Sequence, residues 1–124
     1  MSDSILTSTK KALGIDESYD VFDTDILMHI NSVFSTLQQL GVGPKDGFAI
    51  HNAEAKWDDF LDGDLRLNNV KSYMYVRVRL LFDPPGTSYL INSLDKQAEE
   101  MAWRLNVSRE QSDYENPFDE EEVI

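Results

Sequence analysis

The stretch Tyr73–Gly86, YMYVRVRLLFDPPG, carries two competing apolar patterns, and the choice between them decides the fold. The alternation of apolar residues with Arg77 and Arg79 has the period of a half-buried β-strand. A second apolar set recurs at the three- and four-residue steps of one helical face: Leu67, Val70, Met74, Val78 and Leu81.

The helical pattern is the longer of the two and is not interrupted. No turn residue separates the segment NNVKS from the alternating stretch, whereas a strand of average length, about six residues, would need one. We therefore predict a helix over residues 65–82. It should end at Asp83, because neither Pro84 nor Pro85 can donate the next backbone hydrogen bond.

Three more helices are predicted from the same kind of pattern. One runs from a cap at Ser2 or Asp3 to about Leu13, and the last runs from Thr87 or Ser88 to about Asn106. The clearest covers residues 23–40, with an apolar face of Ile26, Leu27, Ile30, Val33, Phe34, Leu37 and Leu40. The last helix has a narrow seam of Ile91, Leu94, Ala98, Met101 and Leu105.

Length and charge complete the predicted organisation. A chain of 124 residues is long enough for one modest core. Residues 1–108 are predicted to form a small all-α domain of four helices, with residues 47–57 allowing a short β-hairpin insertion and WDDF a single helical turn. Residues 109–124 contain seven acidic side chains and one basic one, so we expect an acidic tail that is disordered when free.

The composition excludes several kinds of protein. Cysteine is absent, which rules out disulfides, thiolate zinc sites and cysteine nucleophiles. No apolar run approaches the roughly 20 residues of a membrane span, so a soluble, non-exported chain is expected. The net charge of −12 opposes adhesive binding to the phosphates of DNA or RNA.

No group of residues forms a convincing catalytic or metal site. Asp25 and His29 share a helix face, but no third ligand has a fixed spacing, so His29 is better explained as a surface or half-buried side chain. The aspartates of DDFLDGD depart from the order of a calcium-binding loop, and helix capping explains them adequately: Asp58, Asp59, Asp62 and Asp64. We predict no catalytic residue, no metal and no cofactor.

Arginines and aromatic side chains off the apolar seams indicate a protein interface instead. Both types are enriched in the cores of interfaces, although exposed arginine heads over buried stems are an equally good explanation of the arginines. The predicted subunit or partner interface consists of Tyr75, Arg77, Arg79, Trp103 and Arg104. In the acidic tail, the predicted docking side chains are Tyr114, Phe118, Val123 and Ile124.

Several extended phrases resemble the head–tail connector family of tailed phages and prophages, small adaptor proteins encoded after the portal and capsid genes. They are ILTSTKKALGI, FDTDILMHINSVFSTLQQLGVGP, WDDFL, NVKSYMYVRVRLLFDPP and EEMAWRLN, which lie between residues 4 and 107. The resemblance does not cover the acidic tail.

The resemblance implies a structural protein of the virion neck that is not an enzyme. It implies a ring of about a dozen helical subunits beneath the portal, assembled in the host cytoplasm and built from head-to-tail contacts. Such a ring would extend the DNA channel, without sequence-specific DNA binding, and would offer a docking platform to the stopper or tail. The tail of this chain could line the channel or bind the portal or the next neck protein, and its apolar residues favour binding.

The sequence also allows two other functions. A small acidic phage protein can mimic DNA and inhibit a basic host protein, but here the acids are densest in the tail and not on a folded face. A small cytoplasmic helical protein with no role in the neck is the other alternative.

Overall fold

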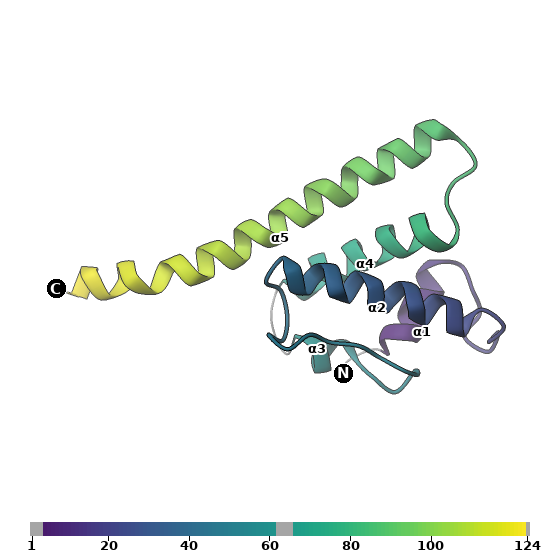
Figure 1. Ribbon diagram of the computed structural model, residues 1–124, viewed down its shortest axis with the longest axis horizontal. Coiled ribbons are helices and arrows are strands. Elements are labelled where there is room, and N and C mark those ends of the chain that lie inside the picture. Colours follow the sequence, from purple (N-terminus) through teal and green to yellow (C-terminus); the bar gives the residue numbers. More distant parts are fainter. Residues whose placement is uncertain (1–3, 62–65, 124) are drawn as a thin grey trace.

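The computed structural model describes residues 4–61 and 66–123, with side chains described as far as Val107. Within these ranges the chain forms five helices and no strand, which confirms the predicted all-α class (Figure 1). The helices are α1 (Ile5–Ala12), α2 (Asp23–Gln39), α3 (Trp57–Phe60), α4 (Leu67–Phe82) and α5 (Ser88–Val123). None of the helices in the described part is both long and apolar enough to cross a membrane.

Helix α4 settles the ambiguous stretch in favour of the helical period. Val70, Met74 and Val78 are fully buried, as the pattern predicted. Leu81 is 46 % exposed, so its assignment to the buried face is wrong. It lies in the last turn, and α4 also packs against two neighbours, α2 and α5, which draws Tyr73 and Val76 into the core beside the predicted row.

Helix α2 supplies the centre of the core. Its buried side chains are those predicted from the pattern: Ile26, Ile30, Val33, Phe34 and Leu37. The Phe34 ring lies 4.7 Å from Phe60, 5.0 Å from Phe48 and 6.4 Å from Trp57, measured between ring centroids. The helix therefore connects the short α3 and the loop before it to the rest of the domain.

Helix α1 begins at a side-chain cap. The Ser4 hydroxyl accepts a hydrogen bond from the Thr7 backbone amide at 3.2 Å, and this satisfies one of the unpaired donors of the first turn. Ile5 and Leu6 face the core, and Leu13 packs against its edge.

The predicted hairpin in residues 47–57 is not formed. Both backbone polar groups of Ile50 bind the Asn31 side chain of α2: Ile50 N donates to Oδ1 at 2.8 Å, and Asn31 Nδ2 donates to the Ile50 carbonyl at 2.9 Å. The segment thus pairs with a helix side chain and not with itself. Its far end makes an isolated antiparallel bridge between Lys56 and Ser4.

Helix α5 starts where it was expected but continues past the predicted end near Asn106. The Leu90 amide donates to the Thr87 hydroxyl at 3.3 Å, and Leu94, Ala98, Met101 and Leu105 pack onto the core. The helical backbone runs to Val123, with no glycine between Ser88 and Val123, and it continues through Pro117. The disorder of residues 109–124 in the free protein stays a prediction.

Candidate assembly surfaces

The predicted interface residues of α4 divide between two faces of that helix. Arg79 Nη1 donates to the Tyr75 hydroxyl at 3.1 Å, so these two side chains form one unit. Arg77 lies on another face, with its guanidinium carbon 6.0 Å from the centroid of the Tyr73 ring. Burial raises the pKa of the Tyr73 hydroxyl, and the positive charge of Arg77 partly opposes that shift.

Each of the two arginines has one side-chain nitrogen without a hydrogen-bond partner among the described residues. The Nε atoms of Arg77 and Arg79 are buried and have no hydrogen-bond partner within the described part of the chain. A buried donor without a partner costs free energy, but an atom closed to solvent is not open to an incoming acceptor. The buried Nε atoms also fit exposed heads over buried stems, so the interface role of the two arginines stays a prediction.

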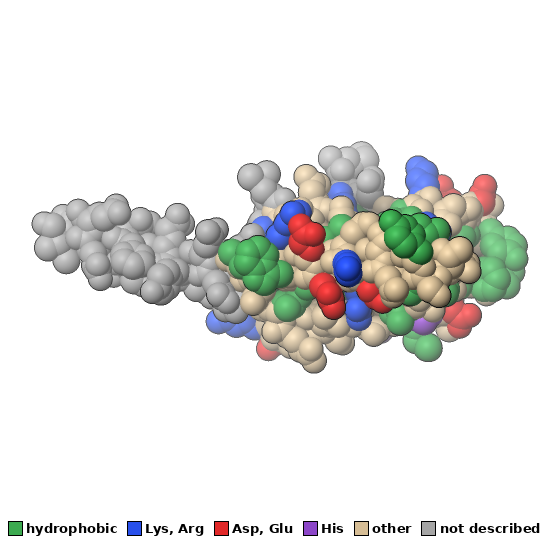
Figure 2. Space-filling view, turned by 90° about the horizontal axis from the view of Figure 1, so that it is seen from above, with side chains coloured by type: hydrophobic (Ala, Val, Ile, Leu, Met, Phe, Trp, Pro, Cys, Tyr) green, Lys and Arg blue, Asp and Glu red, His purple; other side chains and the backbone are tan. Residues whose placement is uncertain are grey.

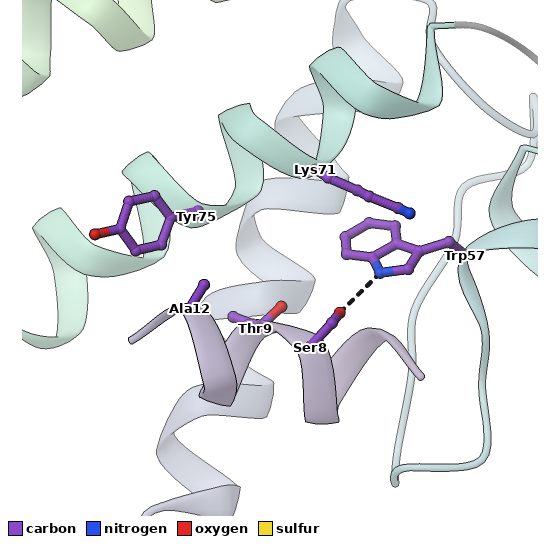
Figure 3. Close-up of a pocket in the computed structure, with 6 residues that line it drawn as sticks. All are labelled: Ser8, Thr9, Ala12, Trp57, Lys71 and Tyr75. Atoms are coloured by element: carbon purple, nitrogen blue, oxygen red, sulfur yellow. Dashed lines mark hydrogen bonds between the residues drawn. The ribbon is translucent and has the colours of Figure 1, made fainter. Parts of the chain in front are cut away.

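A hollow lies between α1, α3 and α4 beside Tyr75. It has a volume of about 190 Å³ and is lined by Ser8, Thr9, Ala12, Trp57, Lys71 and Tyr75 (Figure 3). Trp57 Nε1 donates to the Ser8 hydroxyl at 2.8 Å, which fixes the indole as one wall. The ammonium of Lys71 lies 5.9 Å from the centroid of that indole, within the range of a cation–π contact.

A second hollow continues along α1 and shares Ser8 with the first. Its volume is about 110 Å³, and it is lined by Ser4, Thr7, Ser8 and Lys11. We call the two hollows together the α1–α4 groove. Their linings include two lysines, Lys11 and Lys71, and no acidic side chain.

A second surface, which we call the apolar end, lies where α2 begins, α4 ends and α5 begins. All three points lie toward one end of the molecule, on the right in Figure 1, with the end of α4 between the starts of α2 and α5, and green side chains are seen at that end in Figure 2. Its exposed hydrophobic residues are Tyr19, Val21, Phe22, Met28, Leu81, Tyr89 and Leu90. Residues 14–29 and 80–92 also carry six acidic side chains and no lysine or arginine.

Contacts between aromatic rings join several residues at the apolar end. The centroid of Phe22 lies 5.8 Å from that of Tyr19 and 5.3 Å from that of Phe82. The His29 ring lies 6.3 Å from Phe82, so the histidine packs half-buried against an aromatic ring, in line with the expected role. Among the described residues, no group of three acidic, histidine or cysteine side chains could hold a metal ion.

A buried lysine positions the loop that leads into the apolar end. Lys10 Nζ donates to the Glu17 carbonyl at 3.0 Å and pairs with Asp23 Oδ1 at 2.8 Å. Within the loop, the Ser18 amide and hydroxyl both donate to Asp16 Oδ1, and these hydrogen bonds lower the pKa of the Asp16 carboxyl. The loop is therefore fixed in its middle, at residues 16–18, and where it joins α2 at Asp23.

The remaining predicted interface residues lie on α5. Trp103 is 66 % exposed, and the exposed Arg104 pairs with Glu100 one turn earlier. Tyr114, Phe118 and Val123 belong to the helical backbone of α5, but their side chains lie outside the described part, as does the whole of Ile124. Asp62 and Asp64 are also outside it, whereas Asp59 caps α3 as expected, with Lys56 N donating to its carboxylate at 2.8 Å.

Sequence reasoning missed most of the groove. Lys71 stands four residues before Tyr75 and eight before Arg79, a spacing that would have placed all three on one helix face. The contact of Ser8 with Trp57 joins residues 49 apart, and no local pattern indicates it.

The comparison with known proteins identifies the family of the chain. No curated protein and no solved structure matches the chain. The family model described as phage connector protein matches residues 5–112, which is most of the chain and includes all five helices at least in part. The resemblance seen in the sequence is thereby confirmed, and this protein belongs to the phage connector family, a family of structural proteins.

Proposed function

We propose that this protein is an adaptor of the phage neck, forming a ring of about a dozen copies by head-to-tail contacts. The ring sits beneath the portal, extends the DNA channel and offers a platform to the stopper or tail. The observation that carries the proposal is the match to the phage connector family over residues 5–112. The role is structural and needs neither catalysis nor a cofactor.

The surfaces of the chain support a ring. A closed ring requires each copy to contact its neighbours through two different faces, one on each side. The apolar end and the α1–α4 groove are two such faces, because one is hydrophobic with acidic neighbours and the other is a basic-edged hollow. An exposed hydrophobic group of this size on a small domain is typical of a protein contact.

The charge of the chain suits a channel through which DNA passes. Its net charge of −12 repels phosphate at short range, so DNA would move through the ring without adhering to it. The acidic tail serves a second purpose in this proposal. Its hydrophobic residues Tyr114, Phe118, Val123 and Ile124 dock onto a protein of the assembled neck.

The direct test is reconstitution with the portal protein of the same phage. The mixture should give a ring-shaped density below the portal by electron cryomicroscopy. Replacing the two exposed residues Tyr89 and Leu90 by serine should reduce ring occupancy at least tenfold, because this removes hydrophobic contact area without touching the core. Gln39→Ala, an exposed change at the other end of α2, is the control and should assemble normally.

Two results would count against the proposal. One is a chain that stays monomeric with the portal at high concentration. The other is full assembly of the Tyr89→Ser/Leu90→Ser variant, which would leave the apolar end without a role in the ring.

A further inference from the structure

The backbone of α5 extends away from the rest of the domain toward its C-terminal end (Figure 1). Leu105 is the last fully buried side chain in the described part of the helix. From Leu105 to Val123 the helix advances about 27 Å at ~1.5 Å per residue, and Figure 1 shows it leaving the body of the domain. Its hydrophobic residues therefore need a surface on another molecule.

The chemistry of residues 109–124 defines what that surface must offer. The segment combines the aromatic residues Tyr114 and Phe118 with seven carboxylates, against the single base Arg109. It fits a receptor that has an apolar hollow for a ring and cationic side chains at its edge. Pro117 lacks a backbone donor, so the helix is weakest just before Phe118 and can open there on binding.

The α1–α4 groove has these properties. Its larger hollow, of about 190 Å³, exceeds the ~150 Å³ of a cavity known to bind benzene, so it has room for one aromatic ring. The indole of Trp57 forms a rigid wall, because its nitrogen is held by Ser8. Lys71 stands at that wall, and Lys11 lines the adjoining hollow.

The face of α4 beside the hollow extends the cationic edge. Lys71, Tyr75 and Arg79 follow one another at four-residue steps on a single helix face. Arg79 is bound to Tyr75 through Nη1 but leaves its buried Nε without a partner among the described residues. The Arg79 side chain is partly exposed, so a carboxylate of the acidic segment would pair with the accessible part of its guanidinium.

From these features we propose that the α1–α4 groove of one copy binds the acidic C-terminal segment of a second copy, with Tyr114 or Phe118 seated in the hollow beside Trp57. The segment of the same chain is directed away from its own body, so the contact joins two molecules (Figure 1). The inference rests on the proposed ring and names the partner of the tail within it. In a closed ring every tail and every groove would then be used once.

The first test uses a fluorescent peptide of residues 109–124 and the dilute full-length protein. We expect saturable binding with one site per chain. Lys71→Glu should weaken it at least tenfold, since that variant places a like charge at the wall of the hollow. Lys96→Glu makes the same charge change on the exposed face of α5, outside both hollows, and should bind within twofold of the unchanged protein.

A second pair of variants tests the hollow without altering a charge. Ala12→Trp puts a large ring into the hollow from an exposed position on α1 and should also weaken binding at least tenfold. A peptide in which Tyr114 and Phe118 are both serine should lose binding to the same extent. Circular dichroism of each protein variant establishes that the helices remain.

The outcomes separate this inference from the proposed function. If Lys71→Glu and Ala12→Trp bind the peptide as well as the unchanged protein does, the groove is not the receptor and the inference is wrong, even if rings form on the portal. If the peptide binds the portal and not this protein, the portal is the occupant and the inference is again wrong, while the neck role stands. If the peptide binds as expected but no ring forms with the portal, the proposed function fails separately.

Discussion

At the scale of single residues, the least expected feature is a lysine in the core. Lys10 is 2 % exposed, and its ammonium is held by the Glu17 carbonyl and the Asp23 carboxylate. The sequence predicted α1, although with a cap at Ser2 or Asp3 where the structure has Ser4, and it gave no signal that Lys10 would turn inward. Its partners are seven and thirteen residues away, in a loop and in the next helix, so only the folded chain brings them together.

Replacing Lys10 by methionine should destabilise the domain by about 2–3 kcal/mol. Breaking one side of a buried ion pair typically costs about 3–5 kcal/mol, and the partial exposure of Asp23, 31 %, reduces that value. Chemical denaturation followed by circular dichroism would measure the change. Lys11→Met is the matched control, because Lys11 is exposed, and it should stay within about 0.5 kcal/mol.

A double substitution checks the cause. Lys10→Met combined with Asp23→Leu removes both charges, so it should be more stable than Lys10→Met alone. If the double variant is less stable by the sum of the two single effects, the pair does not act as a pair.

At the scale of helices and loops, long repeated patterns were predictable and tertiary pairings were not. Helices α2 and α4 were predicted from apolar residues that repeat over four turns. For α4, the apolar residues at helical spacing extend over more of the chain than those at strand spacing, and the helical prediction was right. The hairpin in residues 47–57 failed because Asn31, nineteen residues from Ile50, binds that segment. The acidic composition after Ser108 predicts that α5 ends near Asn106. The helical backbone nevertheless runs to Val123, in a stretch that contains no glycine.

The turn after α2 contains a position where only glycine fits. Gly43 has a φ of +93°, and a Cβ there would lie 2.4 Å from an edge carbon of the Phe60 ring. Phe60 is packed between Phe34 and Phe48 and cannot easily move. We expect Gly43→Ala to destabilise the fold by about 2 kcal/mol or more, from backbone strain together with overpacking.

Gly86→Ala provides the comparison for that measurement. Nothing lies within 4 Å of a Cβ built at Gly86, and the residue is exposed. Its effect on the free energy of unfolding should be within about 0.5 kcal/mol, and a slight stabilisation would be reasonable. Equal losses at the two positions would mean that the Phe60 contact is not what restricts Gly43.

At the scale of the whole molecule, we expect the folding and assembling parts of the chain to be separate. Among the side chains that the structure describes, which end at Val107, the last buried one is Leu105, and we expect the core not to depend on residues 109–124. In the sequence, only the acidic composition of residues 109–124 distinguishes them from residues 1–108. The sequence also predicted Tyr75 and Arg79 as interface residues, but not the groove beside them, whose walls come from three helices.

Ending the chain after Ser108 should therefore affect assembly and not folding. We expect the midpoint of thermal unfolding to stay within about 2 °C of the full chain, because no residue of the described core is removed. Ring occupancy on the portal should fall at least tenfold by electron cryomicroscopy. A truncated chain that assembles as well as the full one would remove any docking role from the tail.

The pairing of Ser4 with Lys56 also has a practical consequence for handling the protein. The Ile5 amide donates to the Ala55 carbonyl at 3.0 Å, and Ser4 lines the smaller hollow of the groove. An affinity tag added at the N-terminus is therefore joined to the chain close to this hollow. An acidic tag could bind Lys11 in place of the peptide in a binding assay, so it should be cleaved before use.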